Sequence, residues 1–600
     1  MKKMFFPTVM VSVMVGMLAL FNPNFLHASE CASYPIDAVN PTATSNPAGA
    51  AFPGFRGINQ LVIYDAKNAR KHTGTNEYGV EVVVKKSFSS QQGEIVKITG
   101  ANTPLKAGET VLSAHGTASR WLLAHGKLGS LVKIDTVILA DGSWDPPSET
   151  KKQMLSICEN PKADALALKS LKQYAKAQGG QLKEWADYYD NIHKWAKGNP
   201  DFKGVTSQGL EKDLWAGTAP FYENQIQGVW HRPTLAQSSD AEIKKTLLRF
   251  RDMGINTVFL ETFVHGFTMY PSKVFQKYGI APNAYPKLGV VGNEALLGRW
   301  VRLAHAEGMN VHAWMQVFYV GNSNLNLPTP ILAKFPQWRN RQRQYADDPT
   351  PHPSPIEQGH WFMDPANPQV RQFLMDVVDE LATTYPVDGI QIDYIRYPAS
   401  LEHADANFLA STWGYTPMAR TMFKAKFKVD PLTLTPADIL LWQEWERFKA
   451  SQVTQWVRDL RTYQSLKWNS LRATKQFPEL KLSAAVFPDP KGGHGIKHQD
   501  WPLWMREGVV DFMAPMILSA NEAPVCKALK LMHDINPSIP VVPGLFAPFY
   551  KSPTLSSLKQ MQASYKCEGD GFIWFQSDYL QGDLEEQLKY RKANLVVEGC

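Results

Sequence analysis

The sequence predicts an α/β protein: a TIM (β/α)8 barrel preceded by a small β-rich domain and a helical connector. From residue 225 onward, short apolar segments alternate with amphipathic helical segments eight times, which is the repeat of a TIM barrel. A doubly wound open sheet is the structural alternative, but no Gly-rich phosphate loop follows the first strand. At 600 residues the chain is too long for one hydrophobic core, so two or three domains are expected.

The first residues are typical of a secretory signal peptide, which we assign to residues 1–28. A charged start, an apolar stretch at residues 8–21 and a cleavage-like end at Ala28 support this assignment. An uncleaved membrane anchor and lipid attachment at Cys31 are the alternatives. No second apolar run of about 20 residues follows, so we expect no stable membrane insertion after cleavage. The predicted location is secreted, periplasmic or in the cell envelope.

Four further segments follow the predicted signal peptide. Pro, Ala, Ser and Asn dominate residues 29–58, which predicts a mobile leader. Residues 59–145 contain short β-branched runs separated by Gly and Asn, which predicts the β-rich domain. Residues 146–221 have helical patterns and form the predicted connector to the barrel at 222–600. The expected strands of the β-rich domain lie at residues 60–64, 78–86, 94–100, 111–116 and 130–139.

The barrel prediction rests on eight apolar runs, each followed by a helical pattern. The expected strands lie at residues 226–231, 256–261, 310–318, 387–393, 481–487, 509–517, 540–546 and 571–576. The expected helices lie at residues 238–254, 297–309, 367–385, 440–461, 501–508, 525–535, 557–566 and 583–596. Long loops are expected after the third and fourth strands.

Composition and charge exclude several classes of protein. The formal net charge of +7 is small for this length, and Lys and Arg form no long runs, so no nucleic-acid partner is expected. The five cysteines are an odd number, so at least one is free or pairs between chains. Their spacing and that of the histidines match no metal motif, so neither a metal nor a cofactor is expected. The oligomeric state is left open.

Acidic side chains follow the predicted strands at the end of the barrel where the catalytic groups of TIM barrels lie. Asp393 ends the apolar run 387–393. A buried carboxylate there is expected to have a hydrogen-bonding or charged partner, or a functional role. Glu261 ends the second expected strand, and Asp489 follows the fifth. We take these three acids as the candidate catalytic residues. Glycosidic bond hydrolysis needs two carboxyl groups, one as proton donor and one as nucleophile or base.

Six further side chains at the same end are the candidate substrate-binding residues. They are His231, Trp314, Gln316, Arg396, Tyr397 and Asp578. Aromatic rings in such a position can bind sugar faces. Structural alternatives remain open: Asp393 and Arg396 could form a strand-end ion pair. Asp489 could stabilise a turn, and His231 could be a buried structural histidine.

Seven segments within about residues 222–580 resemble, in register, the glycosyl hydrolase-like 10 family. They are "GVWHRP", "GINTVFLETFVHGFTMYPSK", "EGMNVHAWMQVFYV", "FMDPANPQVRQFLMDVV", "YPVDGIQIDYIRYP", "QDWPLWMREGVVDFMAPMI" and "GFIWFQSDYL". The resemblance implies a TIM barrel and an exported protein, and the family includes a bacterial hydrolase of peptide-free peptidoglycan strands. It also implies that Asp393 is the principal acidic site residue. Many members have a second acid directly after it, where this chain has Tyr394.

The sequence therefore predicts an exported glycoside hydrolase of a bacterial polysaccharide, with peptidoglycan glycan strands as the first choice. One rival is a non-catalytic carbohydrate-binding protein on a hydrolase-like barrel, which the missing second acid favours. A metal-dependent sugar deacetylase is disfavoured because the sequence has no metal cluster. A purely structural envelope protein does not explain an acid- and aromatic-lined barrel mouth.

Overall fold

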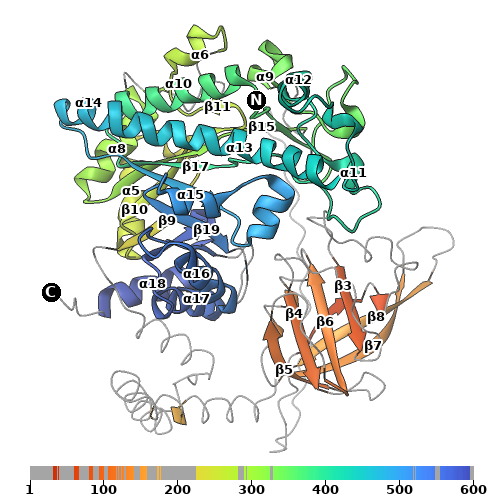
Figure 1. Cartoon of the computed structure of the whole chain (residues 1–600). Coiled ribbons are helices and arrows are strands. Elements are labelled where there is room, and N and C mark those ends of the chain that lie inside the picture. Colours follow the sequence, from red (N-terminus) through yellow and green to blue (C-terminus); the bar gives the residue numbers. More distant parts are fainter. Residues whose placement is uncertain are drawn as a thin grey trace, which may run out of the picture.

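The structure is a computed structural model, shown in Figure 1. In the C-terminal part it describes residues 225–594 except 282–289, 292–293, 324–328, 358, 518, 520–521 and 548–553. In the N-terminal part it describes residues 31–36, 38–39, 60–65, 80–85, 93–99, 106–115, 130–140 and 149–158, and the short pieces 118, 121–122, 125–126, 172–173 and 176.

Eight parallel strands close into a barrel, as predicted. The strands are β9 (Ile226–His231), β10 (Thr257–Val264), β14 (Asn310–Gln316), β17 (Gly389–Asp393), β18 (Lys481–Val486), β19 (Phe512–Ile517), β20 (Gly544–Phe546) and β21 (Gly571–Phe575). They pair in chain order, and β21 pairs with β9, which closes the ring. The open-sheet alternative is therefore wrong.

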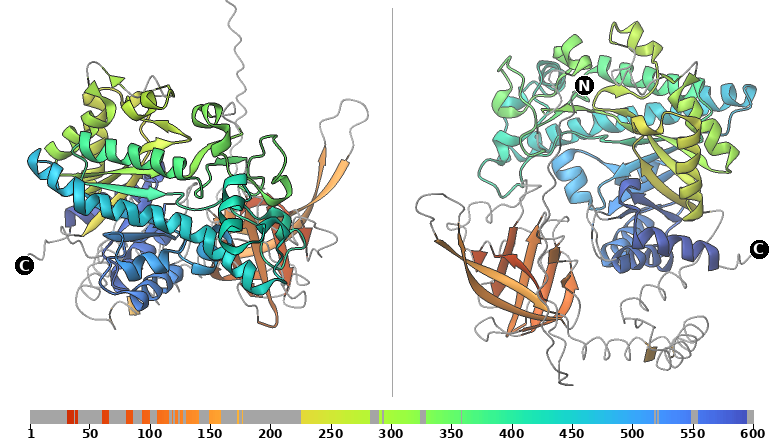
Figure 2. Two further views of the ribbon diagram at one scale, coloured as in Figure 1. Left: turned by 45° about the horizontal axis from the view of Figure 1, so that its top comes forward. Right: turned by 180° about the vertical axis from the view of Figure 1, so that it is seen from behind.

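A helix follows each strand of the barrel. These helices are α5 (Asp240–Asp252), α8 (Leu296–Ala306), α10 (Pro368–Thr384), α13 (Ile439–Tyr463), α15 (Trp501–Glu507), α16 (Ala523–Ile535), α17 (Thr554–Lys566) and α18 (Asp583–Asn594). The helices α10 and α13 lie side by side (Figures 1 and 2), and Trp456 Nε1 of α13 donates to the Arg371 carbonyl of α10. The large apolar core lies between the strands and these helices.

The long loops after the third and fourth strands are present, and short elements lie within them. After β14 come β15 (Tyr319–Asn322), α9 (Pro330–Lys334) and β16 (His360–Phe362); after β17 come α11 (Phe408–Ser411) and α12 (Pro417–Phe427). The remaining short elements are β11 (Phe267–Thr268), α6 (Lys273–Lys277), β12 (Val290–Val291), β13 (Glu294–Ala295) and α14 (Asn469–Thr474).

Side chains fill the inside of the barrel below its mouth. Alternate residues of a strand face opposite sides, so every second residue points inward. The inward cluster comprises Trp230, Phe259, Trp314, Ala485, Phe512, Ala514, Val542 and Ile573. Trp230 Nε1 donates to Gln391 Oε1 at 2.5 Å across the barrel. The barrel below its mouth is therefore a packed core and not a channel.

The N-terminal strands form a separate, mainly antiparallel sheet in the order β1-β8-β7-β5-β4-β6-β3-β2. These strands are β1 (Cys31–Pro35), β2 (Ala38–Val39), β3 (Gln60–Asp65), β4 (Val80–Lys85), β5 (Gly93–Thr99), β6 (Glu109–His115), β7 (Leu131–Ala140) and β8 (Glu149–Cys158). The five strands predicted from sequence correspond to β3 to β7.

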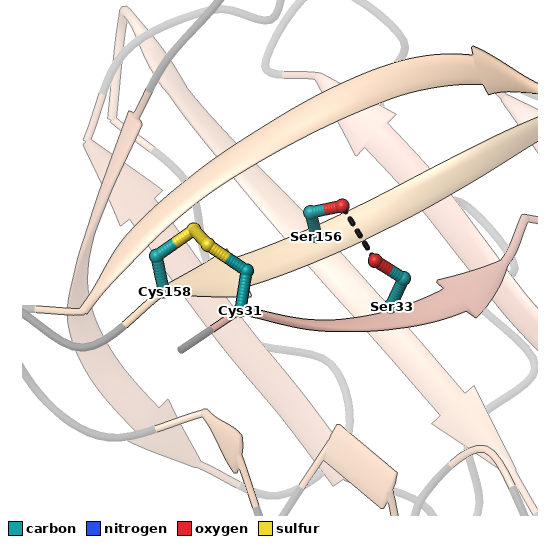
Figure 3. The surroundings of a disulfide bond; sticks show 4 residues. All are labelled: Cys31, Ser33, Ser156 and Cys158. Atoms are coloured by element: carbon teal, nitrogen blue, oxygen red, sulfur yellow. Dashed lines mark hydrogen bonds between the residues drawn. A yellow bond between two sulfur atoms is a disulfide. The ribbon is translucent and has the colours of Figure 1, made fainter. Parts of the chain in front are cut away.

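Strands at both edges of this sheet lie where none was predicted, and at one edge the two-residue β2 falls in the expected leader. Residues 31–35, expected in a mobile leader, form β1, and residues 149–158, expected to begin the helical connector, form β8. The reason is long-range pairing, because β8 lies between β1 and β7 and is antiparallel to both. A disulfide joins Cys31 to Cys158 and a hydrogen bond joins Ser33 Oγ to Ser156 Oγ at 2.8 Å (Figure 3).

Other predictions for the N-terminal part lie outside the described residues. These are the signal peptide at 1–28, most of the leader and most of the connector. Across the described residues, none of the helices combines the length and apolarity that a membrane crossing requires. A second disulfide joins Cys526 of α16 to Cys567, which directly follows α17, and Cys600 lies outside the described residues.

We predict that the double variant Cys31→Ala/Cys158→Ala loosens the edge of the N-terminal sheet. The disulfide closes a loop between residues 127 positions apart, and losing such a constraint costs about 3 kcal/mol. Hydrogen exchange followed by mass spectrometry should show faster exchange in residues 31–35 and 149–158 and unchanged exchange in the barrel. The matched control, Cys526→Ala/Cys567→Ala, should affect α16 and α17 instead. Unchanged protection of β1 and β8 in the first variant would contradict the pairing.

Candidate active site

Four polar side chains occupy the inward positions at the carboxyl ends of four neighbouring strands. Arg232 follows β9, Glu261 is on β10, Gln316 ends β14 and Asp393 ends β17. Gln316 is paired in register with Asp393, and Glu261 with Trp314. The strand β10 continues beyond Glu261 to Val264, with a bulge after Glu261, so the predicted end of this strand was three residues early. These four residues are called the polar quartet below.

Glu261 is almost completely buried and accepts two hydrogen bonds on one oxygen. Arg232 Nε donates to Oε1 at 3.1 Å, and Gln316 Nε2 donates to the same atom at 3.0 Å. Burial raises the pKa of Glu261 to about 7, although the Arg232 charge opposes this rise. The side chain of Arg232 is 43% exposed, so water screens its charge and only part of the burial effect is offset. At neutral pH Glu261 is thus poised to hold or release a proton.

Asp393 is 5% exposed and receives two hydrogen bonds of a different kind. Trp314 Nε1 donates to Oδ2 at 3.1 Å, and the backbone N–H of Tyr394 donates to Oδ1 at 2.6 Å. Burial raises the pKa of Asp393 above its ordinary value, while these two donors favour the ionised form. Each oxygen has one donor, so the carboxylate orientation is fixed.

Tyr394, which stands where many family members have a second acid, is held in an unusual conformation. Its φ of 50° lies in the left-handed region, as does the φ of 51° of His265 after β10. The Tyr394 ring stacks on Tyr319 with centroids 4.7 Å apart, and the Tyr319 hydroxyl is 2.7 Å from His265 Nδ1. Such backbone strain is typical of functional sites, where the surrounding contacts maintain it. An aromatic wall therefore adjoins the two acids.

The other half of the barrel mouth is apolar. Strand alternation places Phe487, Met516 and Phe575 at the inward carboxyl ends of β18, β19 and β21. Met516 and Phe575 pack against the inward apolar cluster, and Phe575 lies 5.8 Å from the Trp230 ring. Phe487 has the Lys497 ammonium 4.2 Å from its ring centroid. The mouth thus combines a charged half with a half suited to the apolar faces of sugar rings.

Arg396, a candidate for substrate binding, is instead committed to a buried ion pair. Its guanidinium donates twice to Glu357, at 2.7 and 3.2 Å, and also to the Tyr397 carbonyl at 3.0 Å. Its charge also lies 4.7 Å from the Tyr394 ring centroid and 5.3 Å from that of Phe362. This pair joins the two long loops. The structure does not contain the ion pair between Asp393 and Arg396 that we considered as an alternative.

The structure keeps His231 away from the polar quartet. It precedes the inward-facing Arg232 and therefore faces outward, 4.9 Å from the Trp300 ring of α8. Both ring nitrogens are occupied: Nε2 donates to Gln237 Oε1 at 3.1 Å, and Nδ1 is 2.8 Å from Ser577 Oγ. Burial lowers the pKa of His231 to about 4. This environment corresponds to the structural alternative for His231.

Three other predicted site residues also have structural surroundings. Asp489 is exposed and accepts a hydrogen bond from the Lys491 N–H at 3.1 Å, which fits the turn alternative. Asp578 is exposed and accepts from Gln576 Nε2 at 3.0 Å. Tyr397 is fully buried, with its ring 5.2 Å from that of His498. Of the nine predicted residues, the structure brings together Glu261, Trp314, Gln316 and Asp393.

Sequence reasoning missed Arg232, Tyr394 and the Tyr319–His265 pair. Strand alternation was the signal for Arg232: if Trp230 faces inward, Arg232 does so too, and His231 cannot. The Tyr319–His265 pair joins two loops and has no local sequence signal. Across the described residues, no group of three or more His, Cys, Asp and Glu side chains could hold a metal ion.

The match to a family model decides the classification. The model described as glycosyl hydrolase-like 10 matches residues 225–547, from the start of β9 to just past β20.

The chain belongs to the glycosyl hydrolase-like 10 family.

The polar quartet lies entirely within the part of the chain that matches the family model.

Curated relatives match a shorter part of the chain. Glycosyl hydrolase DigH of Escherichia coli is 27% identical over 157 residues, which are 25% of this chain and 32% of that protein. The match therefore spans about a third of DigH. An S-layer-related protein of Niallia circulans is 25% identical over 206 residues, 32% of this chain and 13% of that protein. Among solved structures, the PgaB (BpsB) glycoside hydrolase domain of Bordetella bronchiseptica aligns with 62% of this chain and 98% of its own, at 14% identity and a TM-score of 0.43.

The buried ion pair leads to a prediction about Arg396. We expect Arg396→Met to destabilise the barrel by about 3–5 kcal/mol, because it leaves the Glu357 carboxylate buried without its partner. The double variant Arg396→Met/Glu357→Leu should lose less than the single variant, as measured by urea unfolding. The control, Arg447→Met, removes a pair to Glu444 in which the Arg447 side chain is 63% exposed, and should change stability by less than about 1 kcal/mol. Unchanged stability of Arg396→Met with weakened glycan binding would instead assign Arg396 to the substrate.

Proposed function

We propose that this protein is an exported glycoside hydrolase that cleaves a bacterial polysaccharide, with peptidoglycan glycan strands as the first choice of substrate. The observation that carries the proposal is the pair of buried carboxyl groups, Glu261 and Asp393, in different environments at the barrel mouth. Membership of the glycosyl hydrolase-like 10 family and the similarity to glycosyl hydrolase DigH support it. The apolar half of the mouth offers surfaces for sugar rings. The signal-like N-terminus and the two disulfides support export.

The two carboxyl groups have separate roles in this proposal. Glu261 is the general acid, because its pKa of about 7, raised by burial, keeps a proton available at neutral pH. It donates that proton to the glycosidic oxygen as the bond to the leaving sugar breaks. Asp393 is the partner carboxyl group: burial raises its pKa, and an indole N–H and a backbone N–H, one on each oxygen, oppose that rise by stabilising the carboxylate. It acts as nucleophile or base at the sugar carbon.

A non-catalytic carbohydrate-binding protein is the second candidate function. It is favoured by Tyr394, which occupies the place of the second acid of many family members. In the hydrolase proposal Glu261, on a different strand, supplies the second carboxyl group. A hydrolase forms products and loses this activity when Glu261 or Asp393 is substituted. A carbohydrate-binding protein binds the glycan and forms no products in the wild type or in either variant.

The test is mass spectrometry of products from purified peptide-free glycan strands in water enriched in oxygen-18. The wild type should release shorter oligosaccharides with one heavy oxygen at the new reducing end, which distinguishes hydrolysis from lytic elimination. Asp393→Asn and Glu261→Gln should each reduce the rate by at least about 100-fold. Asp489→Asn is the matched control and should retain activity, because its carboxyl group lies on an exposed turn.

Two outcomes would count against this assignment. Equal activity of Asp393→Asn and wild type would remove Asp393 from the chemistry. Tight binding of the strands without cleavage, unchanged in Asp393→Asn, would support the carbohydrate-binding protein instead.

A further inference from the structure

Arg232 contacts Glu261 directly and is linked to Asp393 through Trp314. The two-carboxyl chemistry assigns Arg232 no role. Its Nε donates to Glu261 Oε1 at 3.1 Å, and its guanidinium carbon lies 5.2 Å from the centroid of the Trp314 ring. Trp314 in turn donates its indole N–H to Asp393 at 3.1 Å. A continuous chain of contacts thus runs from Glu261 through Arg232 and Trp314 to Asp393.

We propose that Arg232 is a positioning residue: it orients the Glu261 carboxyl group and stabilises the carboxylate that forms when Glu261 donates its proton to the leaving oxygen. The proposal rests on the proposed function and deepens it. The proton moves from Glu261 to the glycosidic oxygen. The carboxylate left on Glu261 is stabilised by the positive charge of the Arg232 guanidinium. Arg232 itself stays protonated throughout, so it supplies charge and not a proton.

A second Arg–Glu pair in the same barrel shows how the arrangement determines the outcome. Arg396 makes two hydrogen bonds to Glu357, and the two side chains are 6% and 5% exposed. Burial raises the pKa of Glu357, but Arg396, together with the Lys497 charge and the Ala399 N–H, outweighs burial and the pKa is about 2. Glu261 has one hydrogen bond from an arginine that is 43% exposed, and its pKa is about 7 because burial prevails. A single hydrogen bond from a partly exposed guanidinium therefore favours the Glu261 carboxylate without keeping Glu261 ionised at all pH values near 7.

The contact with Trp314 extends the influence of Arg232 to the second acid. A cation over an indole ring is held by the negative face of the π-system, so Arg232 and Trp314 restrain each other. Because the indole N–H fixes Asp393 Oδ2, loss of Arg232 would also loosen the orientation of Asp393. A replacement at this position should therefore lower kcat more than it raises KM.

The first experiment is the pH profile of kcat/KM for Arg232→Met on the glycan that the wild type cleaves. Without the positive charge, Glu261 keeps its proton to higher pH, so the alkaline fall in activity should move up by about one pH unit. At pH 7, kcat should fall by about 10-fold or more, since the Glu261 carboxylate formed on proton donation is no longer stabilised. Arg232→Lys should restore the alkaline limit, because it restores the charge.

The matched control is Arg302→Met, on α8 and outside the barrel mouth. Arg302 Nη2 also lies 3.1 Å from a carboxylate oxygen, that of Glu294, and its side chain is 50% exposed. This variant should retain the wild-type pH profile. An alkaline limit of Arg232→Met that coincides with that of the wild type, or lies below it, would overturn the proposal.

The second experiment needs no activity. Thermal unfolding of wild type, Arg232→Met, Glu261→Gln and the double variant is compared at pH 5 and pH 8.5. Glu261 binds more protons folded than unfolded between its ordinary pKa and about 7, so its burial costs stability as pH rises through that range. Loss of Arg232 should therefore lower Tm more at pH 8.5, where Glu261 is ionised, than at pH 5.

The Glu261→Gln background isolates the ion pair. There, the effect of Arg232→Met on Tm should differ much less between the two pH values, because position 261 no longer titrates and Arg232 keeps only its interactions with Asp393, Tyr394 and His265. If Arg232→Met lowered Tm equally at both pH values with Glu261 present, the proposal would be overturned even if the protein cleaves glycans. If the wild type cleaves no glycan but the Tm values of the four proteins change with pH as expected, the hydrolase proposal fails and the ion pair between Arg232 and Glu261 stands.

Discussion

The two-residue period of strands in a closed barrel is the constraint on which the site depends. Because Trp230, Trp314 and their neighbours fill the barrel interior, the inward polar side chains that lie at its mouth are those at the strand ends. Four neighbouring strands use that position for Arg232, Glu261, Gln316 and Asp393. The pairing register sets Gln316 beside Asp393 and Glu261 beside Trp314, so residues distant in sequence become contact partners.

Burial at the mouth then gives the two acids their different properties. Both carboxyl groups lose most of their contact with water, which favours the neutral form. Asp393 receives one N–H donor on each oxygen, whereas both donors to Glu261 reach the same oxygen. The half-exposed Arg232 offsets only part of the burial of Glu261. Environment, more than residue type, thus distinguishes the two carboxyl groups.

Local pattern was sufficient to predict most of the barrel. Each of the eight strands is a short apolar run followed by an amphipathic helix, and these features are encoded within a few residues of each other. Pairing that depends on distant segments was missed: β1 and β8 become strands because they pair across the sheet and share a disulfide. Residues 149–158 were predicted to begin the helical connector for the same reason: their strand pairing depends on segments distant in sequence.

The positions of the candidate residues at the barrel mouth could be predicted where strand position decides them, and could not where loop geometry decides them. Glu261, Trp314, Gln316 and Asp393 sit on strands, so their place followed from the barrel. Arg396 lies in a loop, and its partner Glu357 is 39 residues earlier in another loop, which no spacing rule predicts. His231 was predicted at the mouth because it ends the first strand, but the alternation that points Trp230 inward turns His231 outward and Arg232 inward.

Direct titration of the Glu261 carboxyl group tests the central claim most directly. Difference infrared spectroscopy of wild type minus Glu261→Gln isolates the C=O band of the protonated acid across a pH series. The account predicts that this band persists at pH 6 and disappears with a midpoint near pH 7, because burial raises the pKa of Glu261 to about 7. A midpoint in the ordinary range of glutamic acid, with no protonated Glu261 left at pH 6, would contradict it.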